Sequence, residues 1–291
     1  MVLINTTVLM SDANHFSTEQ PINPYYGIAP VNRQRAVKEH AAIYDALILA
    51  GINVVKIASP VDSQDGVYTA NWALVRNGKA VLARLPDARK TEESYAAKVL
   101  VDMGIEVITV PDGLKFSGQG DALACGTYLF CGSGYRSDVT AQQFAAEVLG
   151  YERIQLQAIP QRDSNGQPMI NQSSRWADSF FYDIDLALAI IKAPQGDQKG
   201  IIAYCPEAFT AASREVLEHF DAVDKVAVSL LEATEAFATN LISTGETVVM
   251  SAHAPQLRLA LEACGLTIIT PNITELAKGG GYIRCTTLTI S

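Results

Sequence analysis

The chain contains 291 residues, of which 48% are hydrophobic and 18% are charged, and its formal net charge is −9 at pH 7. Lys and Arg are scattered without a basic run, which argues against binding to nucleic acid or to an anionic membrane. A small cationic ligand suits this charge balance better.

The elements expected in chain order repeat one pattern. The opening stretch is apolar but lacks a basic start, so it is expected to form a buried strand rather than a secretion signal, and no membrane span follows it. A glycine that ends a helical pattern and leads into a short β-branched run occurs at residues 51–55, 104–108 and 265–269. Two similar units without that glycine have helices near 140–149 and 208–220, followed by strands at 153–156 and 225–228.

A hairpin-like pair of strands precedes the helices, most clearly around Asn77-Gly78, a strong hairpin turn signal. Similar turns are expected at 194–196 and 243–245. Five units that bury a face only against their neighbours predict a closed ring of ββαβ modules, in which residues 282–290 complete the first module beside strand 2–10. A doubly wound sheet is the alternative, but such sheets join parallel strands through helices rather than hairpins. Because no linker interrupts the pattern, residues 1–291 are treated as a single domain.

Cysteine usage indicates a reducing cytoplasm. The five cysteines are an odd number, widely spaced and without a Cys-x-x-Cys pair, so neither a disulfide framework nor a structural zinc site is expected. Carboxylates alone, without spaced histidines or an EF-hand pattern, do not predict another metal site. The glycines at 118 and 120 lack the third glycine of a dinucleotide fingerprint, and no cofactor is expected.

Cys285 is the best candidate nucleophile. It lies between a triple-glycine turn at 279–281 and a β-branched run that ends the chain. The glycines permit close backbone approach and expose amide donors, and Arg284 is expected to favour the thiolate. The alternative is a buried structural cysteine at the start of a terminal strand.

Short motifs in order along nearly the whole chain resemble the pentein superfamily of guanidino-group-modifying enzymes, within it the amidinotransferase and dimethylarginine dimethylaminohydrolase branch. Residues 65–71 (Asp-Gly-Val-Tyr-Thr-Ala-Asn) resemble that branch's Asp-x-Val-Phe-Thr-Ala-Asn loop. Residues 116–121 resemble its Glu-Gly-x-Gly-Asp turn, and 134–138 its Gly-x-Arg-Thr-Asp turn. Residues 181–188 lie where the family has Tyr-His-Leu-Asp-Thr-Ala-Leu. The resemblance implies a five-bladed α/β propeller with its site in the central channel, in agreement with the five repeated units.

The resemblance also implies a chemistry. A cysteine attacks the central carbon of a guanidinium, an amine leaves, and water or an acceptor amine resolves the thiouronium. By position, Asp65 is a guanidinium clamp, Asn71 a neutral counterpart of a second clamp, and Arg84 and Arg136 hold a carboxylate by bidentate pairing. The expected substrate-binding set is Asp65, Asn71, Arg84, Arg136, Asp121 and Asp185.

The chain departs from the family pattern at the proton-transfer pair. The family histidine falls at Asp183 and the glutamate that orients it falls at Ser117. None of the four histidines (His15, His40, His219, His253) restores the match, and His40 and His219 are expected to face solvent on helices. An aspartate with an ordinary pKa near 4 suits the binding of a cation better than the shuttling of protons.

Three hypotheses therefore stand. The first is a cysteine-dependent enzyme acting on a guanidino or amidino compound, by hydrolysis or by amidino transfer, with Cys285 and Asp183 as the catalytic pair. The second is a pentein without turnover that binds a cationic amino acid or guanidino ligand as a sensor or regulatory protein. The third is a scaffold for protein interaction. The expected partner is a small cationic ligand, and a homodimer is also compatible with the sequence.

Overall fold

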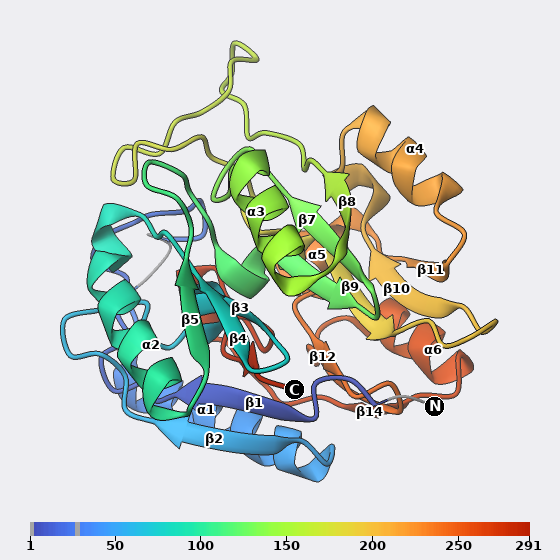
Figure 1. Cartoon of the computed structure of the whole chain (residues 1–291), viewed down its shortest axis with the longest axis horizontal. Coiled ribbons are helices and arrows are strands. Elements are labelled where there is room, and N and C mark those ends of the chain that lie inside the picture. The colour runs from blue at the N-terminus through green and yellow to red at the C-terminus, as the bar shows by residue number, and fades with distance from the viewer. Residues whose placement is uncertain (1–2, 27–29) are drawn as a thin grey trace.

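The structure, a computed structural model that describes residues 3–26 and 30–291, contains five three-stranded sheets around a common centre. In Figure 1 the chain passes from one sheet to the next around this centre, and the helices cover the outer sides of the sheets. This arrangement is the five-bladed propeller that the repeats predict.

Each sheet has the same topology: an antiparallel pair followed by a parallel third strand that is reached through a helix. In the second module, β3 (Ala73–Arg76) and β4 (Lys79–Leu82) form the hairpin at Asn77-Gly78. Strand β5 (Glu106–Thr109), reached through α2 (Lys90–Asp102), completes the second module. The third module repeats this order with β6 (Ala122–Cys125), β7 (Tyr128–Gly132), α3 (Val139–Leu149) and β8 (Glu152–Leu156). The fourth module repeats it with β9 (Leu188–Lys192), β10 (Gly200–Tyr204), α4 (Ala211–His219) and β11 (Val223–Ala227).

The first module is closed by the two ends of the chain. Strand β1 (Thr7–Ser11) pairs in parallel with β2 (Asn53–Ile57) across α1 (Arg33–Leu49), and antiparallel with β15 (Leu288–Thr289). The expected terminal pairing is therefore confirmed, although both strands are shorter than predicted. Asn5 has a φ of 52°, which ends the extended strand. At this point the chain forms hydrogen bonds with the fifth module: the Ile4 amide donates to the Thr244 carbonyl, and Asn5 Nδ2 donates to the Ser243 carbonyl.

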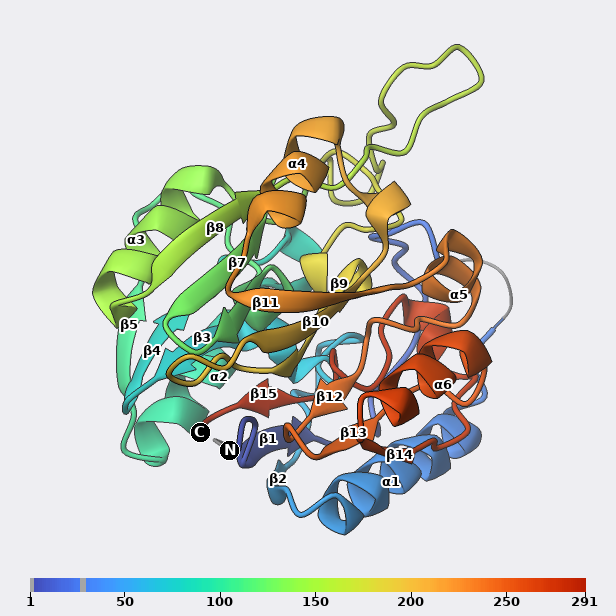
Figure 2. The same ribbon diagram turned by 90° about the vertical axis from the view of Figure 1, so that its right-hand side faces the viewer.

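The fifth module has the shortest strands. It consists of β12 (Ile242–Ser243), β13 (Thr247–Val249), α6 (Pro255–Ala263) and β14 (Thr267–Ile269), and the extra helix α5 (Leu230–Glu235) precedes it. Figure 2 shows this module beside β1 and α1, where the ring closes. No helix within the described part of the chain is long and apolar enough to cross a membrane.

A tight turn stands before the first strand of each module and positions the candidate site. Three of these turns are 3₁₀ helices, at Thr69–Trp72, Gly118–Gly120 and Ile184–Leu186. The other two are the turns that contain Asn240 and Cys285. Because the five modules are related by the ring, these five turns point their residues to the same central region.

Candidate active site

The turns before the first strands of the modules supply the polar side chains of the centre. Four modules have Asn71, Asp185, Asn240 or Cys285 in the turn before their first strand. The remaining module has Gly120, where an added Cβ would lie 2.6 Å from the nearer carboxylate oxygen of Asp183. The glycine is therefore required because its missing side chain leaves the space that the side chains of Asn71 and Asp183 occupy.

Cys285 is 2% exposed and its thiol is held by two polar neighbours. Asn240 Nδ2 donates to the sulfur at 3.1 Å, and the thiol donates to Asp185 Oδ2 at 3.4 Å. The same asparagine accepts the backbone amides of Tyr282 and Cys285 through Oδ1, both at 3.1 Å. Asn240 thus fixes both the turn and the direction of the sulfur.

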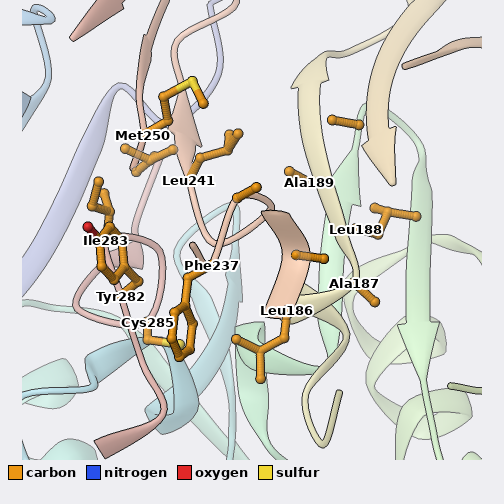
Figure 3. Close-up of a cluster of buried hydrophobic side chains, with 14 of the residues drawn as sticks. Leu186, Ala187, Leu188, Ala189, Phe237, Leu241, Met250, Tyr282, Ile283 and Cys285 are labelled. Carbon is orange, nitrogen blue, oxygen red and sulfur yellow. The ribbon is translucent and has the colours of Figure 1, made fainter. Parts of the chain in front are cut away.

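The thiol stands at the edge of an apolar cluster that includes Phe237, Tyr282 and Ile283 (Figure 3). Burial raises the pKa of Cys285 well above its ordinary value, and the nearby carboxylates Asp185 and Asp183 raise it further. The charge of Arg284 does interact favourably with Cys285, as expected, but burial and the two carboxylates outweigh it. Arg284 points elsewhere, and its Nη2 donates to Gln119 Oε1 at 2.9 Å.

The glycine turn permits the close approach to the backbone that the sequence predicts, but the approaching groups are side chains of the protein itself. Gly280 has a φ of 81°, and an added Cβ would overlap the hydroxyl of Tyr68 at Gly279 and the ring of Tyr68 at Gly281. The Gly280 carbonyl accepts the Tyr182 hydroxyl at 2.8 Å. These contacts show that the glycines admit two tyrosines against the backbone of the cysteine turn, rather than leaving its amides open.

Asp183 is 1% exposed and lies in a closed hydrogen-bond network. Ser117 Oγ donates to its Oδ1 at 2.8 Å, and Asn71 Nδ2 donates to its Oδ2 at 2.7 Å. Burial raises the pKa of Asp183, and the charge of Arg136 and these two hydrogen bonds oppose the rise. The structure thus brings together Asp183 and Ser117, the two residues expected at the positions of the family pair.

Asp121 and Asp185 complete a group of mutually repelling carboxyls with Asp183. Burial raises the pKa of both Asp121 and Asp185 well above the ordinary value, and the charge of Asp183 adds to each rise. Asp121 Oδ1 also accepts the backbone amide of Ile184 at 3.0 Å, so it ties two central turns together. A bound cation in this region would stabilise the ionised carboxylates.

Asp65 and Arg136 are both buried, and the opening segment of the chain covers them. The Tyr26 hydroxyl donates to Asp65, and burial raises the pKa of this carboxyl. Arg136 Nη2 donates to the Ile22 carbonyl at 2.6 Å, and its guanidinium lies 4.6 Å from the centre of the Tyr182 ring. Both expected ligand-binding groups therefore already have partners within the chain.

Arg84 does not join this cluster, which corrects the sequence prediction. Its guanidinium pairs with Asp112 at 3.0 Å and with Glu93 at 3.7 Å, near the surface. Arg89, five residues later, is 3% exposed and donates to Asn71 Oδ1 at 2.8 Å. It also pairs with buried Glu92 at 2.7 Å.

The histidines give one further correction. His40 is 4% exposed, and burial, with the charge of Lys56 next, lowers its pKa to about 4. Its neighbour Glu39 faces inward too, because it accepts the backbone amides of residues 274 and 275. His219 and His253 are exposed, and His15 is half-buried. None of the four has a hydrogen bond to the central turns among the described residues.

Three residues of the site were missed or left without a role by sequence reasoning. The sequence gives Arg89 and Asn240 no role, and only their hydrogen bonds reveal which groups they hold. Tyr26 had no signal, because it lies in an irregular segment without periodicity. Its proximity to Asp65 depends on how that segment folds back over the ring.

The ring of five ββαβ modules and its central cysteine define a pentein. Residues 11–291 match the family described as N,N dimethylarginine dimethylhydrolase, eukaryotic, and the chain belongs to this family. It is 30% identical over 283 residues to the N(G),N(G)-dimethylarginine dimethylaminohydrolase of Mycobacterium tuberculosis, a match that covers 97% of this chain and 84% of that protein.

Other relatives are longer. The bifunctional arginine dihydrolase/ornithine cyclodeaminase AgrE of Nostoc sp. is 29% identical over 290 residues, which cover 97% of this chain but only 37% of that protein. Among solved structures, the product-bound N-terminal domain of ArgZ, a cyanobacterial arginine dihydrolase, has a TM-score of 0.85 at 26% identity, over 98% of this chain and 97% of that one. The Pseudomonas aeruginosa dimethylarginine hydrolase with citrulline has a TM-score of 0.74 at 14% identity, covers 99% of both chains and supports the fold.

Proposed function

We propose that this protein is a cysteine-dependent hydrolase that cleaves a C–N bond in the guanidino group of arginine or an arginine-like compound. The observation that carries the proposal is the placement of the Cys285 thiol 3.4 Å from Asp185 and 3.1 Å from Asn240, inside the family's ring. The relatives named for arginine dihydrolase and for dimethylarginine hydrolase activity support the same class of substrate.

In this proposal the buried carboxylates hold the cation and Cys285 attacks it. A guanidinium carbon becomes electrophilic when its positive charge is fixed by acids on either side. Asp65 and Asp185 supply such charges, and each has a pKa raised by burial, so a cation would offset the cost of their ionisation. Arg136 is the candidate partner for the carboxylate of an amino-acid substrate.

Asp183 takes the place of the family histidine and positions the cation or a water molecule. A carboxyl with its ordinary pKa is a weak acid–base catalyst; burial raises the pKa of Asp183, and the charge of Arg136 and the hydrogen bonds from Ser117 and Asn71 oppose that rise. Ser117 and Asn71 hold both of its oxygens, so its orientation is fixed. These contacts support a positioning role.

Product analysis tests the proposal. We expect the protein to release a ureido product and ammonia or an amine from arginine, methylated arginines, agmatine or a short guanidino acid. Cys285→Ser is expected to abolish the reaction, and Cys264→Ser, at an exposed cysteine, is the matched control. Turnover that survives Cys285→Ser would contradict the covalent route. Formation of a new guanidine when a primary amine is added would instead indicate amidino transfer.

Ligand binding without turnover is the second candidate function. It is favoured because Asp183 and Ser117 stand where the family has its histidine and glutamate. These two residues form a hydrogen bond with each other. A guanidino ligand would then raise the melting temperature without being consumed, because it binds the folded state. Activity that appears only in Asp183→His with Ser117→Glu would support this candidate and contradict hydrolysis by the natural protein.

A further inference from the structure

A cavity of about 500 Å³ lies at the hairpin side of the ring, and its lining includes Leu3, Ile4 and Asn5 near the start of the chain. Its mouth includes the exposed turn residues Asn77 and Gly126, which connect the paired strands of the second and third modules. In Figure 1 the chain's C-terminus lies near the first of these hairpins. Ser291 also lines the cavity, so the chain's end is part of its wall.

The cavity floor reaches the candidate active site from behind. Asp185, Arg284 and Thr239 line it and are all buried. Asp185 uses Oδ2 to accept the thiol of Cys285. Its Oδ1, and Thr239 Oγ1, have no hydrogen-bond partner within the described residues. Buried polar atoms of this kind beside a roomy polar cavity are commonly satisfied by water.

The opposite approach to Cys285 is occupied by protein. Tyr26 and the Ile22 carbonyl hold Asp65 and Arg136, the groups assigned to the substrate. An amino-acid substrate that bound Asp65 and Arg136 in their place would itself occupy that side of the centre, so water could not enter there. A cavity of about 500 Å³ has room for on the order of ten water molecules, since each takes about 30 Å³ in the liquid.

We propose that this cavity is the route by which water reaches, and ammonia or a small amine leaves, the carbon bound to Cys285, with Asp185 as the proton carrier between them. The inference rests on the hydrolase function proposed above. It assigns the small reactants to one mouth of the ring and the guanidino compound to the other.

The proton steps balance. As the sulfur bonds to the guanidinium carbon, the thiol proton passes to Asp185, which gives it to the departing nitrogen as the C–N bond breaks. In the second half, water loses a proton to Asp185 as its oxygen bonds to the carbon. The C–S bond then breaks, the sulfur recovers this proton from Asp185, and the remaining hydroxyl proton of the former water passes to the released ammonia, which becomes ammonium. The sum is guanidinium plus water giving a ureido compound and ammonium, without any oxidant or reductant.

Blocking the cavity tests the route. Ala124 is exposed on β6 and lines the cavity, whereas Ala227 is exposed on β11 and lies outside its lining. Ala124→Trp is expected to fill the passage, and Ala227→Trp is the matched control. If Ala124→Trp fails to fold, Ala193→Trp, at another lining position, replaces it.

The first readout does not depend on turnover. The rate at which a small uncharged thiol reagent labels Cys285 is measured by peptide mass spectrometry, with exposed Cys264 as the internal reference. We expect labelling of Cys285 to slow severalfold in Ala124→Trp and to match the wild type in Ala227→Trp, with Cys264 unchanged. Equal labelling of Cys285 in both variants would overturn the route even if the protein proves to be an active hydrolase.

The second readout addresses the chemistry. If the wild type turns over, the covalent adduct on Cys285 is expected to persist longer in Ala124→Trp, because water reaches it more slowly. If the wild type does not turn over, the labelling readout still decides the route, so the two failures are distinguishable. Preferential formation of a new guanidine from an added amine in the wild type would overturn the assignment of the cavity to water.

Discussion

Replacing Asn240 with alanine tests how the cysteine turn is held. The side chain is completely buried, and its Oδ1 accepts two backbone amides, those of Tyr282 and Cys285. A buried donor left without a partner costs about 1–3 kcal/mol, so Asn240→Ala is expected to destabilise the protein by about 2–6 kcal/mol. This is a large part of the total stability of about 5–15 kcal/mol typical of folded proteins.

Equilibrium unfolding in urea measures the loss as a lower midpoint at unchanged slope. Asn240→Asp is the matched variant, because it keeps an acceptor for both amides and replaces only the Nδ2 donor to the sulfur. Its added charge is expected to raise the pKa of Cys285 further and to shift the alkylation profile of this thiol to higher pH. A loss below about 0.5 kcal/mol in Asn240→Ala, a size usual for surface changes, would refute the proposed role of the asparagine.

Further predictions concern the buried charges. Burial raises the pKa of Asp185, so its contribution to stability is complete below the ordinary value of 3.8 and is lost as the pH rises through the folded-state pKa. Asp185→Asn is therefore expected to have a higher melting temperature than the wild type at neutral pH and the same melting temperature at about pH 4. An equal gain in melting temperature at the two pH values would contradict this. Arg89→Met leaves Glu92 buried without its counter-charge and is expected to cost about 3–5 kcal/mol in urea unfolding, much of it recovered by adding Glu92→Gln. No recovery in the double variant would show that the pair is not the cause. Binding of a guanidino cation is expected to release protons and to tighten as the pH rises, because the cation favours ionised carboxylates. Calorimetry in buffers of different ionisation enthalpy measures this, and proton uptake would contradict it.

The fold was predictable because its signals are local and repeated. A helix-ending glycine, a β-branched run and a hairpin turn occur in the sequence itself, and each module needs only its neighbours to bury its faces. The length of the first strand was not predictable. It depends on Asn5, whose positive φ and contact with Ser243 belong to the closure of the ring.

The residues of the central turns were predictable from their motifs, whereas the choice between two arginines that follow one strand was not. Arg84 and Arg89 both follow the same strand, and the intervening turn determines that only Arg89 faces inward. His40 was misplaced because its charged neighbour Glu39 suggested a solvated helix face, whereas Glu39 binds backbone amides of a distant segment. A buried carboxylate whose hydrogen-bond donors lie more than 200 residues away leaves no local pattern in the sequence.

Covalent capture on Cys285 tests the catalytic proposal most directly. The protein is mixed with a guanidino substrate, quenched rapidly in acid and analysed by intact and peptide mass spectrometry. We expect a mass increase located on the peptide that contains Cys285, absent from Cys285→Ser and absent from Cys264. Ureido product formed by Cys285→Ser, or an adduct confined to another residue, would contradict nucleophilic attack by this thiol.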